Sequence, residues 1–219
     1  MRYLYIDTSS SYLNTALVDD NNLLASINEE FGQSLSEVVV PKIVSMFQEN
    51  NIEPKDIDKI IVVNGPGSFT GIRIGITIAK VYAWSLNIPI TTIDSLSAMA
   101  LSSKENKIHI PMINARRGYV YGAIYDEDNR ILLKPQHIKQ VDLEKEYQKY
   151  PNREIISNDE LEINEQIKSY TPDFLKIVNF YKDKENINPH AVNPEYLKLT
   201  EAEASKLWFE KLRKIILKN

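Results

Sequence analysis

The stretch YIDTSSSYLNTALVD, residues 5–19, decides the fold, because the chain repeats it in altered form as MINARRGYVYGAIYD, residues 112–126. Aligned without gaps, the two stretches share an isoleucine, a tyrosine, an alanine and a final aspartate, and their apolar positions match between these identities. Two similar hairpins can agree by coincidence, but here the pattern, the turn and the identities agree in one register. We therefore interpret the second half, from about residue 106, as a degenerate copy of the first.

The first half opens with strands and continues with alternating helices and strands. Apolar runs predict three strands at residues 2–8, 15–18 and 23–27, and the polar residues 19–22 form the turn between the last two. Spacing then predicts a helix at 34–50, a strand at 60–63, a helix at 70–86, a strand at 89–92 and a helix at 95–102. Strands separated by helices imply right-handed parallel crossovers. The expected α/β fold is a mixed sheet, flanked by helices, of the ribonuclease-H-like type.

Two helix starts carry capping signals. Ser34 and Glu37 match the capping box at the start of the first helix, and Pro41 inside that helix should kink it or start a second segment. Thr171 and Pro172 predict the cap and first position of a helix over residues 172–184.

The expected division into subdomains follows from the repeat. It places residues 1–104 in a first subdomain and 105–200 in a degenerate second one. A further helix is predicted at residues 142–150, and the helix at 201–219 is expected to pack back on the first subdomain.

Composition excludes several classes of protein. The 219 residues include no cysteine, so disulfides, thiolate metal sites and a cysteine nucleophile are excluded. The net charge of −4 is unfavourable for a protein that holds nucleic acid alone. The sequence has no apolar run long enough to span a membrane and no secretory h-region, so we expect a cytoplasmic protein that does not bind membranes.

A glycine-rich loop, NGPGSFTGIRIG at residues 64–75, resembles a phosphate-binding loop. It fails the P-loop pattern because no lysine follows a glycine, and it fails the dinucleotide pattern because Gly71 comes one residue late. What remains is a stripe of small residues at helical spacing, formed by Gly71, Gly75, Ala79 and Ala83. The stripe allows close packing either of this chain's own first helix or of a partner's helix. The residues alone do not distinguish between these two alternatives.

Candidate catalytic groups are few. Asp7, Thr8 and Ser9 end the first strand where actin-like ATPases place a metal-associated aspartate, but no glycine follows Asp7 and the repeat has Asn114 there. We therefore interpret Asp7 as an acid that caps a turn, and these positions as a vestigial phosphate loop. The three histidines are isolated in the sequence, so no catalytic or metal site is predicted.

The motifs together resemble the TsaB family, also called YeaZ. The matching strings are IDTSSSYLNTAL from Ile6, GPGSFTGIRIG from Gly65, INARRGYVYGAIYD from Ile113 and NPEYLKL from Asn193. The resemblance covers the whole frame and is weakest between residues 139 and 190. Many relatives have His-Ser where this chain has Gln33-Ser34, which removes a polar contact but keeps the cap.

The resemblance implies a duplicated actin-like fold and a non-catalytic role in forming threonylcarbamoyladenosine beside the anticodon of tRNA. In that family, TsaB pairs with its catalytic paralogue TsaD through its first two long helices, here residues 34–50 and 70–86, and the ATPase TsaE joins them. It self-associates when alone, and it reaches tRNA through the complex. The resemblance implies no cofactor held by this chain alone, and it allows ATP or ADP to bind at the interface with the partner. The predicted interface residues are Leu35, Val39, Ile43, Phe69, Gly71, Ile72, Gly75, Ala79 and Ala83.

Two other functions are alternatives to this non-catalytic role as a scaffold. One is an enzyme in its own right, an actin-like ATPase or, following an older family label, a peptidase; the damaged phosphate loops and missing metal histidines argue against both. The other is a structural protein that only self-associates, which an exchange experiment with a TsaD-like chain would separate from the scaffold.

Overall fold

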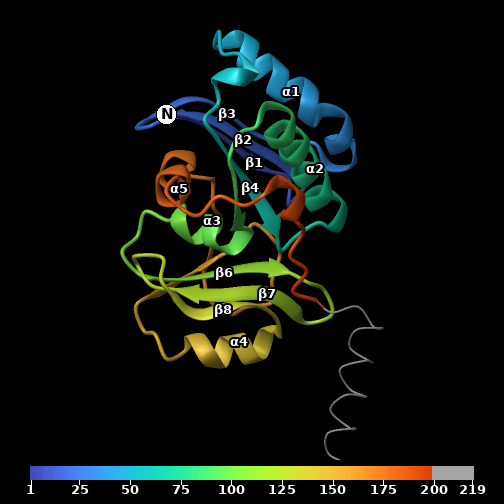
Figure 1. The fold of residues 1–219 in the computed structure, drawn as a ribbon. Helices are drawn as coiled ribbons and strands as arrows, with labels where there is room; N and C mark the ends of the chain where they lie inside the picture. The colour runs from blue at the N-terminus through green and yellow to red at the C-terminus, as the bar shows by residue number, and fades with distance from the viewer. Residues whose placement is uncertain (199–219) are drawn as a thin grey trace, which may run out of the picture.

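Two lobes, each built on one five-stranded sheet, make up the molecule (Figure 1). The computed structural model describes residues 1–198. The first sheet has the order β3-β2-β1-β4-β5, and the second, taken from the matching edge, has the order β8-β7-β6-β9-β10. The strands of the first sheet are β1 (Arg2–Asp7), β2 (Tyr12–Asp19), β3 (Asn22–Glu30), β4 (Lys59–Gly65) and β5 (Ile90–Asp94). Those of the second are β6 (Ile108–Asn114), β7 (Tyr119–Tyr125), β8 (Ile131–Lys139), β9 (Arg153–Ile156) and β10 (Ile167–Lys168).

The shared strand order confirms the duplicated, actin-like arrangement in outline. In each sheet the first three strands are antiparallel neighbours and the last two join in parallel. Residue by residue, however, the copies differ. Tyr5 lies opposite Ala16 in the first hairpin, whereas Met112 lies opposite Gly122 and not Ala123 in the second. The gapless alignment is therefore wrong by one residue, because the turn of the second hairpin is one residue shorter.

Helices cover both faces of the sheets (Figure 1). α1 (Leu35–Glu49) and α2 (Phe69–Leu86) pack on one face of the first sheet, and α5 (Phe174–Tyr181) packs on the other. α4 (Gln140–Tyr147) covers the outer face of the second sheet. Short 3-10 turns occur at Gly32–Ser34, Pro54–Asp56 and Pro189–Ala191. Within the described part of the chain, the helices are too short or too polar to cross a bilayer.

α3 (Ser95–Leu101) lies between the two sheets and is buried at all seven positions. Its Ala98 and Leu101 pack with the first sheet, while Leu96, Met99 and Ala100 pack with the second. A helix buried on every side serves two cores at once. The helix that ends the first copy therefore also closes the second.

The second lobe ends earlier than the expected boundary at residue 200. α5 buries Phe174, Ile177 and Val178 against the first sheet. Further along, Ile187 bridges to β5, and Val192 belongs to the core under α1 and α2. The chain returns to the first lobe at about residue 172, because the apolar face of α5 completes that sheet's second side. The helix predicted at 201–219 lies outside the described residues.

Helix starts differ from the sequence predictions in two places. The side chain of Ser34 makes no capping hydrogen bond, since a 3-10 turn leads directly into α1. α5 begins two residues after Pro172, and Asp173 caps it by accepting a hydrogen bond from the Lys176 amide at 3.0 Å. α1 continues through Pro41 as one helix.

Candidate functional site

A cleft of about 1180 Å³ separates the two lobes. Its first-lobe wall is the turn after β1, around Ser9 and Ser10, together with Gly67 and Ser68. Its second-lobe wall includes Arg116 and the loop after β9. This is the position at which an actin-like fold would hold a nucleotide, so the fit of its loops to phosphate decides what the cleft can do.

The first loop is filled by this chain's own glycine-rich turn. Ser68 N–H donates to the carbonyl oxygen of Ser9 at 2.6 Å, and the Thr8 hydroxyl donates to the carbonyl oxygen of Gly71 at 2.7 Å. A Cβ on Gly67 would overlap the Ser9 carbonyl, and one on Gly71 would overlap the Thr8 carbonyl. The glycines therefore allow two backbone segments to touch, and no space remains for a phosphate between them.

Asp7 is buried at the end of β1 and accepts the amide N–H of Ser9 at 2.8 Å. Asn14 lies at 3.5 Å from its other oxygen. Burial raises the pKa of Asp7, and the hydrogen bonds from Ser9 and Asn14 lower it in part. The carboxylate thus caps its own turn, as predicted, and it is directed at protein donors.

The opposite loop offers no phosphate cradle either. The backbone N–H of Asn114 donates to the carboxylate of Asp159 at 2.7 Å, and the Asn114 side chain accepts the N–H of Arg116 at 2.8 Å. Arg116 and Arg117 both adopt positive φ, of 66° and 56°. The Asp159 carboxylate already accepts the backbone N–H that a bound anion would need. The residues of this cleft therefore do not fit a nucleoside triphosphate.

Among residues 1–198, no three His, Asp or Glu side chains lie close enough together to hold a metal ion. The histidines lie apart: His109 is buried beside Glu154 at 2.9 Å, His137 stacks on Tyr119 at 4.7 Å, and His190 contacts Trp84.

The small-residue stripe of α2 faces inward. A Cβ on Gly75 would overlap the hydroxyl of Thr8 and contact Ile6 of β1, and Ala79 and Ala83 are buried in the same core. The Gly71–Gly75 end of the stripe therefore packs against β1 and the turn that follows it, and Ala79 and Ala83 lie in the core that α2 shares with α1 and the first sheet. Close approach of a helix to a strand needs small residues as much as helix pairing does.

Eight of the nine predicted interface residues are buried in this chain's own core, and the prediction that they form an accessible surface is wrong for the single chain. They are Leu35, Val39, Ile43, Gly71, Ile72, Gly75, Ala79 and Ala83. Phe69 alone is exposed, at 56%. Helical periodicity identified the apolar face correctly, but that face is the one that builds the core.

A different set of apolar side chains is exposed on the same two helices. α1 exposes Val40 and Val44, and α2 exposes Val81, Trp84 and Leu86, all between 41% and 65%. The two helices lie side by side over the first sheet (Figure 1). We call these five exposed apolar residues of α1 and α2 the exposed apolar layer, a candidate for contact with another protein.

A strap, residues 187–196, borders this surface. Lys80 of α2 donates to the carbonyl oxygens of His190 and Val192, and Arg73 donates to the hydroxyl of Tyr196 at 2.7 Å. The ring of Tyr196 stacks on Phe69 with centroids 5.1 Å apart. The strap therefore extends the aromatic edge of α2.

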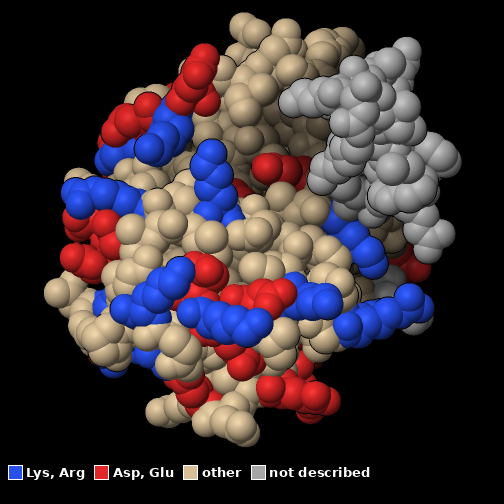
Figure 2. All heavy atoms as spheres, turned by 90° about the horizontal axis from the view of Figure 1, so that it is seen from below, with Lys and Arg blue, Asp and Glu red and all other residues tan. Residues whose placement is uncertain are grey.

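Charge on the lower face of the second lobe is mixed. Figure 2 shows basic and acidic side chains next to one another there. Among the described pairs, Lys145 lies 2.9 Å from Asp142, and Arg153 lies 2.8 Å from Glu165. Paired charges do not make the clustered positive field that a nucleic-acid backbone requires.

Comparisons with known proteins decide the family. A family model described as TsaD, tRNA N6-adenosine threonylcarbamoyltransferase, matches residues 27–203. The chain is 30% identical to the tRNA threonylcarbamoyladenosine biosynthesis protein TsaB of Bacillus subtilis, over 96% of this chain and 99% of that protein. The chain belongs to the TsaB family. The TsaB of Escherichia coli is 32% identical over 58% of this chain and 56% of its own length.

Solved structures of the TsaB family share the fold. YeaZ from Pseudomonas aeruginosa superposes with a TM-score of 0.70 at 18% identity, covering 90% of this chain and 99% of that one. A second Pseudomonas aeruginosa chain, described by its similarity to peptidase YEAZ, gives a TM-score of 0.72 at 17% identity. At these identities the likeness establishes the fold alone.

Sequence reasoning about this TsaB-family chain missed its exposed apolar layer. Val81 and Trp84 occupy helical positions that look like ordinary core residues, because a sequence does not say which side of an amphipathic helix is already covered. The available signal was that α2 carries apolar residues on more than one face, which is unusual for a helix with one wet side.

Proposed function

We propose that this TsaB-family chain is a non-catalytic scaffold that activates a TsaD-like catalytic subunit in the formation of threonylcarbamoyladenosine next to the anticodon of tRNA. A TsaE-like ATPase is the third member of the proposed complex. The observation that carries the proposal is the exposed apolar layer of α1 and α2, the helices through which the family resemblance implies pairing. Val81, Trp84 and Val44 would lose water on contact with a partner, and such burial drives association.

The cleft supports a non-catalytic role. Its vestigial phosphate loop is packed against the glycine-rich turn, and Asp7 is committed to Ser9. ATP or ADP, in this proposal, would bind at the interface with the partner and not in the chain's own cleft. The proposed contact with tRNA is indirect, which suits the net charge of −4.

Two substitutions on the exposed layer test the pairing. Val44→Asp and Val81→Asp each place a carboxylate where a partner would bury it, so we expect the apparent Kd for the TsaD-like chain to rise about tenfold or more. Both side chains are exposed, at 45% and 59%, so the fold should tolerate the change. Ile131→Asp is the matched control, because Ile131 is 53% exposed on β8 of the other lobe.

The readouts are co-purification and a tRNA-modification assay with the co-expressed TsaD-like and TsaE-like proteins. Parallel loss of pairing and modification in the two variants, with the control unaffected, is the expected result. Wild-type pairing in both variants would contradict this surface. A homodimer that never exchanges with the TsaD-like chain would favour the purely self-associating alternative.

An intrinsic activity would contradict the non-catalytic role directly. We expect the purified chain neither to hydrolyse ATP nor to cleave peptides. ATP hydrolysis that disappears in Asp7→Ala would overturn the scaffold proposal.

A further inference from the structure

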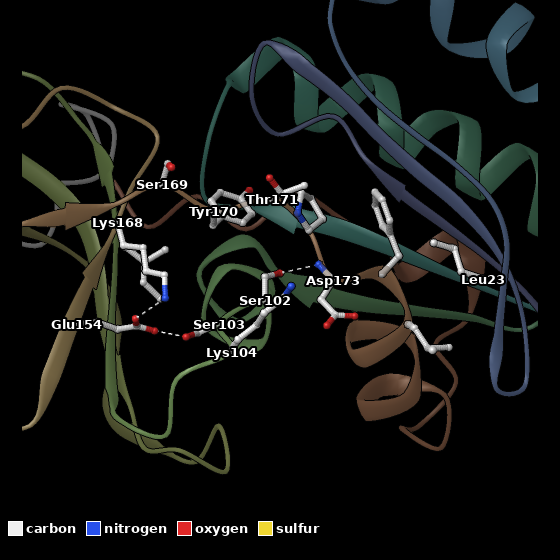
Figure 3. Close-up of a pocket in the computed structure, with 14 residues that line it drawn as sticks. Leu23, Ser102, Ser103, Lys104, Glu154, Lys168, Ser169, Tyr170, Thr171 and Asp173 are labelled. Atoms are coloured by element: carbon white, nitrogen blue, oxygen red, sulfur yellow. Dashed lines mark hydrogen bonds and ion pairs between the residues drawn. The ribbon is translucent and has the colours of Figure 1, made fainter.

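A second pocket, of about 500 Å³, lies where both connections between the lobes pass each other (Figure 3). The outgoing connection supplies Ser102, Ser103 and Lys104, and the returning connection supplies residues 169–173. We call it the hinge pocket. The returning segment also lines the interlobe cleft, so one wall separates the two spaces.

The two connections are tied together at this pocket. The backbone N–H of Asp173 donates to the Ser102 hydroxyl at 3.1 Å, and the Lys176 ammonium donates to the Ser103 carbonyl at 2.9 Å. The pocket walls are therefore held by hydrogen bonds, and the pocket does not depend on a loose loop.

The acidic groups of the hinge pocket are already engaged. Glu154 accepts from the Ser103 hydroxyl, from Lys168 at 3.3 Å and from His109 at 2.9 Å. Burial raises the pKa of Glu154, but its hydrogen bonds to Ser103 and Lys168 outweigh burial and leave that pKa below its usual value. Asp173 caps α5. Both oxygens of Glu154 are therefore occupied by donors, and Asp173 uses one of its oxygens for the cap.

One cation at the pocket is uncommitted. Lys104 is exposed and lines the pocket, and within residues 1–198 no carboxylate lies within ion-pair distance of its ammonium group. Figure 3 places it between Glu154 on the second-lobe side and Asp173 on the other. An ammonium group at a pocket whose acids are taken favours an anion.

Apolar side chains line part of the pocket, beside polar residues such as Lys168, Ser169 and Thr171. Phe174 is buried and forms its wall with Leu175, Pro172 and Ile156, and Leu23 stands at the first-lobe side with 45% of its surface exposed. A concave site of this volume that combines apolar walls with convergent polar groups has the form of a small-molecule site.

We propose that the hinge pocket binds a small amphipathic carboxylate, with its carboxylate on Lys104 and its apolar body between Phe174 and Leu23. A single charge fits better than a phosphate dianion, because the pocket offers one uncommitted ammonium group and Glu154 lies nearby. The ligand contacts both lobe connections and so favours one arrangement of the lobes. This site goes beyond the proposed function and needs no partner.

The test uses the full chain and three probes, octanoate, octylamine and acetate. Octanoate carries the charge and the apolar body, octylamine reverses the charge, and acetate lacks the apolar body. Amide chemical shifts on titration locate the site. We expect octanoate alone to bind, with shifts gathered at residues 102–104 and 169–175.

Lys104→Ala should raise the apparent Kd for octanoate about tenfold, because it removes a charge-assisted hydrogen bond. Lys104→Arg should restore binding. Lys107→Ala is the matched control, since Lys107 lies on the same connection, pairs with Glu105 and does not line the pocket. Equal binding of octylamine, an unchanged Kd in Lys104→Ala, shifts confined to α1 and α2, or no binding at millimolar octanoate would each overturn the proposal.

Discussion

The two lobes share one strand order but differ in what crosses between their last two strands. In the first lobe β4 connects to β5 through α2, a helix of 18 residues. In the second lobe β9 connects to β10 through residues 157–166 without a helix, and β10 is only two residues long. The sheet survived duplication in both copies, whereas the crossover helix remains only in the first.

This difference shows that a sheet of this kind can bury both of its faces without a crossover helix between its last two strands. The second sheet is covered by α4 on one face and by α3, borrowed from the first copy, on the other. Its core is complete without a crossover helix. The first copy keeps α1 and α2, and both expose apolar residues beyond what the core uses. Solvent-exposed apolar residues on α1 and α2 favour contact with a partner, which is the basis of the proposed function.

The largest effect should come from filling the contact between α2 and β1. Gly75→Leu places a side chain where even a Cβ overlaps the Thr8 hydroxyl, so we expect the free energy of unfolding to fall by about 3 kcal/mol or more. Urea unfolding measures it. Gly122→Ala is the comparison in the second lobe, because there a Cβ meets only the flexible end of Leu143 and should cost about 1 kcal/mol or less.

A stable Gly75→Leu chain that lost only its pairing with the TsaD-like protein would contradict this packing. It would mean that the small-residue face of α2 contacts a partner and not the first sheet.

An intermediate effect should come from Asp94, the acid that ends β5 and caps α3, whose counterpart after β10 is Asp173, the cap of α5. Burial, opposed only in part by hydrogen bonds from the Ser97 amide and the Tyr125 hydroxyl, raises the pKa of Asp94 from 3.8 to about 6. A raised carboxyl pKa means that the neutral form is favoured in the folded state. Its contribution to stability is therefore full below the unfolded pKa and is lost as pH rises through about 6.

Asp94→Asn should remove this dependence while keeping an oxygen for the cap. At about 1.4 kcal/mol per pKa unit, the difference in unfolding free energy between wild type and variant should change by up to about 3 kcal/mol between about pH 4 and pH 7. Denaturant unfolding across that range measures it. Parallel pH profiles for the two proteins would show that Asp94 is ionised without penalty.

The smallest effect should come from the loop that replaces the crossover helix in the second lobe. Arg153 donates to both carboxylate oxygens of Glu165, at 2.9 and 2.8 Å, and so anchors residues 157–166. Because the pair is partly exposed, Glu165→Gln should lower the free energy of unfolding by only about 0.5–1 kcal/mol. Pairing with the TsaD-like chain should not change. A loss of pairing in this variant would mean that the second lobe also takes part in the interface.

Sequence alone determined the fold class, because the repeat at residues 5–19 and 112–126 and the alternation of apolar runs are local properties of a chain. It also predicted that no intact phosphate loop is present, since no glycine follows Asp7 and residues 65–75 match neither nucleotide pattern. It could not determine what lies against the stripe of Gly71 and Gly75, because a small residue signals a close neighbour without naming it.

Tertiary structure decided the remaining points. It placed Gly71 and Gly75 against β1 and its following turn, exposed Val81 and Trp84, and returned α5 to the first sheet. It also brought Lys104 and Phe174 to one pocket from two distant segments. Which face of a helix remains exposed to solvent depends on all the segments that pack against its other faces. Those contacts come from the whole chain and cannot be predicted from one stretch of sequence.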